Sequence, residues 1–178
     1  LPLNRTIRGG AIIFDFTGTS ITRAVSAIGG AWVSLPALAS SPTKGSRTLE
    51  FASTPTGVAE NSIIALRDPT DGSFNGIDPV GRDYYRAGEY CLVKGVSGTT
   101  VTVVEPLLAG YDHTVITTHK FPDDTINFKV GRLTVLGGNN VGTTVTFNRL
   151  RDAVHDKISA IGGSSQAMSR LECYNISG

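Results

Sequence analysis

Two short apolar segments near the end of the chain share one pattern and lie 25 positions apart. Leu133-Thr-Val-Leu-Gly-Gly138 is followed by Ile158-Ser-Ala-Ile-Gly-Gly163, and a shorter segment, Cys173-Tyr-Asn-Ile-Ser-Gly178, ends the sequence. Strand-sized units that recur with a period in the twenties are typical of solenoids, in which each unit stacks on its neighbour. The repeat therefore predicts an all-β coil. The side chains expected in its interior stacks are Leu133, Val135, Ile158, Ala160, Leu171 and Cys173.

The composition also favours strands and turns over helices. Charged residues make up 17% of the chain, which is below the usual share of about a quarter, and glycine occurs 21 times. Valine, threonine and glycine are abundant, as in proteins built from many short strands. The strongest competitor for a helix, residues 148–157, joins two of the repeated strands. At 178 residues the chain has the size of one domain with its own core.

Alternating apolar residues predict further strands before the repeat. Residues 6–18 are expected to form two short strands, and residues 48–52 and 62–67 one strand each. Residues 20–28 alternate weakly, so a strand and a short helix both stay open. The segment from 68 to 81 is rich in turn-forming residues and is expected to be a loop.

A β-hairpin is the clearest local prediction in the middle of the chain. Tyr90–Val96 and Thr100–Val104 flank the short connection Ser97-Gly98-Thr99. The resulting domain organisation is an irregular opening region with loops and the hairpin over residues 1–129. The first regular rungs of the coil follow over residues 130–178 and are expected to continue beyond the C-terminus, because a coil cut between rungs exposes a strand edge.

Charge and hydropathy exclude two classes of partner. The net charge is +1 and the 16 basic residues are scattered, so no nucleic-acid partner is expected. The 20 residues from 24 to 43 carry no charge, but they contain glycine and proline and cannot form a good membrane-spanning helix. No membrane partner is therefore expected.

Cysteine and histidine spacing gives no sign of a metal site. Cys91 and Cys173 lie 82 positions apart and are expected to be free thiols buried in strands. His113, His119 and His155 share no ligand spacing. The paired glycines lack the strand-to-helix context of a dinucleotide loop. Neither a metal nor a cofactor is expected.

Four segments, taken in order, resemble a known family. They are Gly-Ala-Ile-Ile-Phe-Asp-Phe-Thr-Gly (10–18), Tyr-Tyr-Arg-Ala-Gly-Glu-Tyr-Cys-Leu-Val (84–93), Val-Ser-Gly-Thr-Thr-Val-Thr-Val-Val-Glu-Pro-Leu (96–107) and Leu-Thr-Val-Leu-Gly-Gly (133–138). This order resembles the opening rungs of pectate-lyase-like right-handed parallel β-helices, and most of all those of bacteriophage tailspike proteins. The resemblance covers most of the chain from residue 6 onward and is a pattern of rungs rather than a signature motif.

The resemblance implies both a fold and a function. The fold is a right-handed single-stranded parallel β-helix, of which this chain holds the initial rungs with an irregular opening and a β-hairpin. The implied protein is a homotrimer in the virion tail, outside the cell, attached to other tail or virion proteins. As a full-length protein it would bind and depolymerise bacterial surface polysaccharide, capsule or O-antigen, during host attachment, as a hydrolase or a lyase. This fragment would be inactive alone.

Two other functions stay open, because fold alone does not decide function. One is a structural adhesin that binds glycan without cleaving it. The other is part of a cellular polysaccharide lyase. The resemblance further implies a particle-binding domain before Leu1, and more rungs with a trimerising part after Gly178.

The carboxylates of the repeating segment are the catalytic candidates. Glycoside hydrolysis needs two carboxylates about 5–5.5 Å apart for retention or about 6.5–9.5 Å apart for inversion. Neighbouring strands about 4.8 Å apart can supply such a pair. The candidates are Asp152, Asp156 and Glu172. The alternative interpretation is a set of solvated charges on turns beside Arg149 and Arg151.

Aromatic side chains are the candidates for carbohydrate binding, since sugars often rest on aromatic rings. These candidates are Trp32, Tyr84, Tyr85, Tyr111 and Tyr174. The alternative is packing against neighbouring side chains, which is common for aromatic residues at strand ends. Glu89, in Gly-Glu-Tyr, is interpreted as a strand-edge residue where the chain enters the hairpin.

Overall fold

The computed structural model describes residues 6–7, 12–68, 70, 88–122, 129–130, 132–139, 141–152, 154–155 and 158–171. Every regular element within these ranges is a β-strand, which confirms the all-β class. A search of the same residues for a helix long and apolar enough to cross a membrane finds none. The chain divides into two compact units. Unit 1 consists of Leu1–Ala31 and Pro122–Gly178, and unit 2 of Trp32–Phe121.

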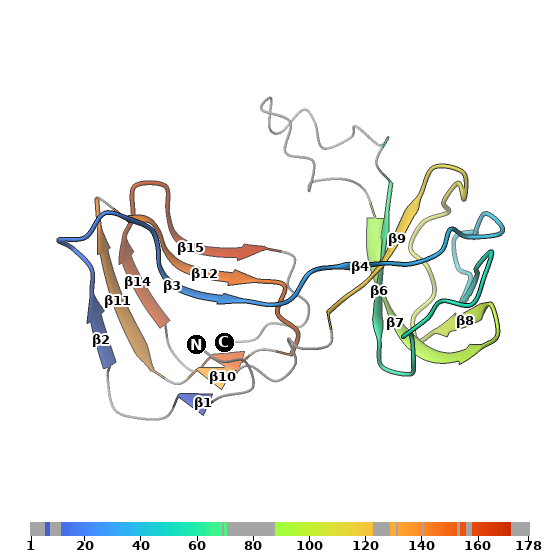
Figure 1. Ribbon diagram of the computed structural model, residues 1–178, viewed down its shortest axis with the longest axis horizontal. Helices are drawn as coiled ribbons and strands as arrows, with labels where there is room; N and C mark the ends of the chain where they lie inside the picture. Colours follow the sequence, from blue (N-terminus) through green and yellow to red (C-terminus); the bar gives the residue numbers. More distant parts are fainter. Residues whose placement is uncertain are drawn as a thin grey trace. The chain divides into compact units, whose positions relative to one another are not determined.

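Unit 1 contains three parallel sheets of three strands each (Figure 1). The first sheet holds β1 (Thr6–Ile7), β10 (Lys129–Val130) and β13 (Val154–His155); the second holds β2 (Ile12–Asp15), β11 (Leu133–Gly138) and β14 (Ile158–Gly162); the third holds β3 (Ile21–Ile28), β12 (Val141–Asn148) and β15 (Gln166–Leu171). The chain visits the three sheets in the same order three times. The strands of the second pass lie in the middle of each sheet.

The strand register confirms the repeat read from the sequence. Leu133 pairs with Ile158 and Val135 with Ala160, so the 25-residue spacing is the spacing of equivalent positions on adjacent strands. On its other side Leu133 pairs with Ile12. The first 31 residues, which the sequence assigns to the irregular opening region, therefore contribute strands to the same sheets as the later strands of the repeat.

The core of unit 1 lies between the second and third sheets. It is formed by Ala27, Leu133, Val135, Val145, Phe147 and Leu150, with Ile158, Ala160 and Met168 half-buried against them. Four of the expected interior residues are thus confirmed: Leu133, Val135, Ile158 and Ala160. Cys173 lies outside the described residues, and the side chain of Leu171 is not described.

A stacked corner joins the second sheet to the third. Gly138 and Gly162 both have positive φ, 63° and 84°, where side chains with a Cβ are strained. The fully buried Thr144 donates a hydrogen bond from its Oγ1 to the carbonyl oxygen of Gly162 at 2.8 Å. The turn therefore requires glycine at both positions.

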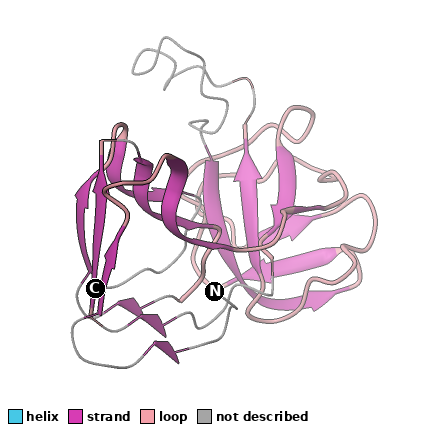
Figure 2. Cartoon of the chain, turned by 60° about the vertical axis from the view of Figure 1, so that its left-hand side comes forward, coloured by secondary structure: helices cyan, strands magenta, loops and turns pink. Residues whose placement is uncertain are grey.

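Unit 2 is built on antiparallel pairing, unlike unit 1 (Figure 2). Its strand order is β4 (Val33–Ser34), β9 (Thr117–Lys120), β6 (Ile63–Arg67), β7 (Gly88–Ser97), β8 (Thr100–Val103) and β5 (Thr48–Glu50). β7 and β8 form the predicted hairpin, in which Ser97 pairs with Thr100 and Gly98 has a φ of 58°. The irregular opening region expected over residues 1–129 therefore contains an antiparallel unit, which follows the first pass of the parallel sheets.

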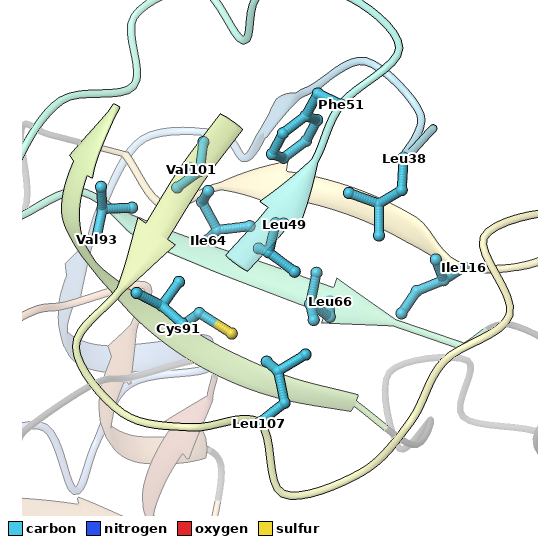
Figure 3. Packing of buried hydrophobic residues seen from close by; sticks show 11 residues of the cluster. Leu38, Leu49, Phe51, Ile64, Leu66, Cys91, Val93, Val101, Leu107 and Ile116 are labelled. Carbon is cyan, nitrogen blue, oxygen red and sulfur yellow. The ribbon is translucent and has the colours of Figure 1, made fainter. Parts of the chain in front are cut away.

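The core of unit 2 gathers aliphatic side chains from β5, β6, β7 and β8, as Figure 3 shows. Its buried members are Leu38, Leu49, Phe51, Ile64, Leu66, Cys91, Val93, Val101, Val103, Leu107 and Ile116. Cys91 is a buried free cysteine, as expected. The segment at residues 20–28, for which a strand and a helix stayed open, is strand β3. The described part of 148–157 contains no helix.

Candidate functional site

An open groove on unit 2 follows from the hairpin. Because β7 and β8 run antiparallel, the start of β7 lies beside the residues that leave the end of β8. The groove has a volume of about 480 Å³ and is lined by Glu89, Tyr90, Cys91, Glu105, Pro106 and Leu108. It combines an aromatic ring, two aliphatic side chains and two carboxylates in one concave surface.

Glu89 connects the two sides of this groove. Its Oε1 and Oε2 accept a hydrogen bond from the backbone N of Leu108, at 3.2 and 3.1 Å. It also forms a side-chain hydrogen bond with Tyr111, and burial together with this bond raises the pKa of the Tyr111 hydroxyl. Glu89 is thus more than the strand-edge residue expected from the sequence, since it holds the segment after β8 against β7.

Cys91 lies in the groove wall as a neutral thiol. Burial raises the pKa of Cys91 to about 12, and the nearby charge of Glu89 adds to the shift. A thiol is nucleophilic only as the thiolate, which this environment disfavours. The groove therefore offers binding groups rather than a cysteine nucleophile.

Trp32, an expected sugar platform, is held among three other side chains. Its ring stacks on that of Tyr90 with centroids 5.9 Å apart and an interplanar angle of 3°. Phe121 meets it edge-on at 4.9 Å, and the guanidinium carbon of Arg67 lies 4.4 Å from the Trp32 ring centroid. Tyr90, with 39% of its surface exposed, is the member of this group that lines the groove.

Tyr90 is a site residue that the sequence did not single out. The sequence shows it only as a residue of a predicted strand, within Gly-Glu-Tyr-Cys-Leu-Val. The alternation along β7 is a signal that could have found it, because Cys91 and Val93 point into the core and Tyr90 therefore points to the opposite face. The stacking of Tyr90 on Trp32, in contrast, could be known only from the folded structure.

Of the other four aromatic candidates, only Tyr111 lies within the described residues. Tyr111 packs against the core of unit 2 and bonds to Glu89, and it does not line the groove. Tyr84, Tyr85 and Tyr174 lie outside the described residues.

Of the three catalytic candidates, only Asp152 is described. It lies in the turn after β12 with a φ of 51°, and its Oδ2 accepts a hydrogen bond from Nε of Arg151 at 2.9 Å. Its side chain is about one-third exposed, at 32%. Asp156 and Glu172 lie outside the described residues. Asp152 is thus an ion-paired carboxylate on a turn of unit 1.

The histidines do not form a metal site in the described part of the chain. Nδ1 of His113 lies 3.0 Å from Oγ of Ser41, in a contact between two surface loops of unit 2. Within the described ranges there is no group of three or more His, Cys, Asp or Glu side chains able to hold a metal ion.

Comparisons with known proteins bear on the whole chain. Residues 27–118 match the family model described as "Tailspike protein-like, Ig-like domain". No curated protein matches this chain. Among solved structures, the tailspike protein gp49 of Pseudomonas phage LKA1 is 28% identical with a TM-score of 0.67, over 91% of this chain and 26% of that one.

Two further tailspikes share the fold at lower identity. The tailspike gp61 of Pseudomonas phage phi297 is 23% identical with a TM-score of 0.60, over 92% of this chain and 31% of that one. The gp54 tailspike of Acinetobacter baumannii bacteriophage AP22, solved in complex with A. baumannii capsular saccharide, is 18% identical with a TM-score of 0.67, over 96% of this chain and 30% of that one. The chain thus spans about a quarter to a third of the length of these proteins.

The matched family model covers just over half of the chain and nearly all of unit 2, which is the antiparallel unit that carries the groove. The resemblance to phage tailspike proteins is confirmed by this match and by the solved structures. The chain therefore belongs to the tailspike protein-like family, with residues 27–118 as its Ig-like domain.

Proposed function

We propose that this chain is part of a phage tailspike that binds bacterial surface polysaccharide, capsule or O-antigen, and depolymerises it during host attachment. The observation that carries the proposal is the combination of three repeated parallel strand passes with a tailspike-type Ig-like domain inserted after the first pass. The AP22 tailspike, which has a similar fold over 96% of this chain, was solved with a capsular saccharide. That complex supports a polysaccharide as the ligand class.

Unit 1 is, in this proposal, the beginning of a right-handed single-stranded parallel β-helix. Its support is the constant order in which the chain visits three parallel sheets, and the 25-residue register in the second sheet. In a parallel coil each strand forms hydrogen bonds with the rungs on both sides. Such a coil suits an elongated tailspike. We assign the protein to the virion tail, as a homotrimer that contacts other tail proteins.

Depolymerisation is assigned to the intact protein rather than to this chain alone. Asp152, Asp156 and Glu172 stay the carboxylate candidates within the repeating segment, since parallel neighbours about 4.8 Å apart suit a carboxylate pair. The pairing of Asp152 with Arg151 also fits a solvated structural charge. The residues that cleave the polysaccharide are therefore to be sought in all rungs of the intact protein.

The test uses the intact tailspike and polysaccharide purified from its host strain. A hydrolase releases new reducing ends, whereas a lyase produces the ultraviolet absorbance of an unsaturated uronate. The control is polysaccharide from a strain that the phage does not infect. Binding without either product would replace the depolymerase by the adhesin, and a protein that neither binds nor cleaves would contradict the proposal as a whole.

A further inference from the structure

We propose that the groove on the Ig-like domain is a saccharide-binding site, which holds a neutral, hydroxyl-rich sugar residue against the ring of Tyr90. This inference rests on the proposed function, and it names a site and a class of sugar that the proposed function does not. The site lies wholly within unit 2, between the start of β7 and the segment after β8.

The groove has the size and the apolar surface that a sugar requires. Its volume of about 480 Å³ lies within the range of small-molecule sites, roughly 300–1,000 Å³. Leu108 is 76% exposed and Tyr90 is 39% exposed, and both line it together with Pro106. Exposed apolar side chains that line a concave surface mark a binding site more often than isolated ones do.

Tyr90 is prepared as a platform by the residues behind it. One of its ring faces stacks on Trp32, and Trp32 is in turn contacted by Phe121 and Arg67. A ring held in this way loses little conformational entropy when a ligand binds, which favours affinity. Tyr90 is therefore the aromatic surface on which the sugar stacks, a role that the sequence suggested for Trp32, and Trp32 supports the ring of Tyr90 from behind.

The polar groups of the groove select a ligand that donates hydrogen bonds. Carboxylates only accept, and the ionisable side chains in the groove walls other than tyrosine and cysteine are Glu89 and Glu105. Glu89 is already bonded to Leu108 and Tyr111. The Glu105 carboxylate is exposed and has no hydrogen bond or ion pair with another described residue.

A pyranose fits this combination because one side of its ring presents C–H groups and its edge presents hydroxyl donors. The C–H side can lie on Tyr90 and the hydroxyl groups can donate to Glu105. The two carboxylates repel the acidic group of a uronic or sialic acid, so a neutral sugar is favoured. A basic peptide would also be attracted to the carboxylates, and salt dependence separates the two, because charge–charge attraction is screened.

The experiment measures binding of defined saccharides to the 178-residue chain. Maltose and N,N′-diacetylchitobiose serve as neutral probes, and glucuronic acid as the acidic one. Trp32 is the only tryptophan, so its fluorescence reports on the stacked pair directly. Amide chemical shifts of residues 88–91 and 105–108 locate the ligand. We expect saturable shifts with at least one neutral probe, little change with added salt, and none with glucuronic acid.

Variants test the platform and the acceptor separately. Tyr90→Ala is expected to weaken neutral-probe binding about tenfold, as for the loss of an aromatic contact surface. Tyr90→Phe keeps the ring and should bind within about threefold of the parent, and it controls for disturbance of Trp32. Glu105→Gln should weaken binding several-fold. Val96→Ala and Glu60→Gln, exposed residues of unit 2 outside the groove, are the matched controls and should bind normally.

Three results would overturn the proposal. They are no saturable shift with either neutral probe, unchanged binding in Tyr90→Ala, and preferential binding of glucuronic acid or of a lysine-rich peptide that salt abolishes. Failure here is distinct from failure of the proposed function. An intact tailspike that depolymerises its polysaccharide while the groove stays empty contradicts only the groove. A groove that binds sugar in a tailspike without depolymerase activity contradicts only the enzymatic assignment.

Discussion

At the scale of single residues, the corner between the second and third sheets of unit 1 depends on glycine. Gly162 has a φ of +84°, and a Cβ added to it would lie 2.6 Å from the backbone N of Gly138 on the neighbouring strand β11. Both the backbone conformation and the close approach of β11 and β14 exclude a side chain there. Gly18, by contrast, has no atom within 4 Å of an added Cβ.

Gly162→Ala is therefore expected to lower the free energy of unfolding by about 2 kcal/mol or more, from the left-handed conformation and from the overlap. Gly18→Ala is the matched control and should change it by less than about 0.5 kcal/mol. Urea unfolding followed by far-ultraviolet circular dichroism measures both. Equal effects of the two substitutions would show that β11 and β14 do not approach as closely as this corner requires.

At the scale of elements, strand β11 presents alternate side chains to the core of unit 1 and to the opposite face of its sheet. β11 pairs with β2 on one side and with β14 on the other. Its Leu133 is buried, with 5% of its surface exposed, whereas Ile13 on the outer strand β2 is 63% exposed. The two residues are both aliphatic and belong to the same sheet, but Ile13 pairs with Thr134 and therefore lies on the opposite face from Leu133.

Leu133→Ala should lower the free energy of unfolding by about 2–5 kcal/mol, because it removes buried methyl groups and leaves a cavity. Ile13→Ala should change it by about 0.5 kcal/mol or less. Denaturant midpoints of the two variants, with unchanged slopes, give the comparison. A larger loss for Ile13→Ala would mean that its outward face is covered by another surface in solution.

At the scale of the whole molecule, the Ig-like domain is an insertion between the first and second passes of the parallel sheets. Unit 2 has its own core, and its first and last residues, Trp32 and Phe121, contact each other with ring centroids 4.9 Å apart. Because the two ends of unit 2 meet, it can be deleted and the flanking residues joined without distorting unit 1. A unit with its own core can also fold alone.

The segment 32–121 is therefore expected to unfold cooperatively as an isolated fragment. Its Trp32 fluorescence should report the same transition as circular dichroism. In the reciprocal variant a short Gly/Ser linker joins Ala31 to Pro122, and unit 1 should keep its β-type spectrum. A fragment without a cooperative transition would contradict the autonomy of unit 2, and loss of β structure in the linker variant would contradict that of unit 1.

Two features could be predicted because they depend on neighbours along the chain. The hairpin of β7 and β8 needs only a glycine between two alternating segments, and the pairing of β11 with β14 repeats an apolar pattern 25 positions later. In contrast, Leu133 also pairs with Ile12, which lies on the far side of the inserted unit. No local pattern marks that partner, since closing so long a loop depends on the folded core of the insertion.

The candidate site shows the same division. Aromatic residues and carboxylates could be selected from the sequence by type, and among them Trp32 belongs to the group behind the groove. Which ring lines the groove depends on the face of β7 that carries Tyr90, and on Phe121 and Arg67, which pack around Trp32. Tyr90 and Glu105 therefore became candidates only when the hairpin brought their segments together.

The sequence by itself determined that this protein is all-β, that its last part repeats as stacked strands, and that it resembles phage tailspikes. Those properties follow from composition and from patterns among residues close together in the sequence, so they can be recognised without the fold. The tertiary structure alone decided that residues 12–28 join the later strands and that residues 32–121 form a separate antiparallel unit with a groove. Such pairings join positions far apart in the chain, and only the folded core holds them together.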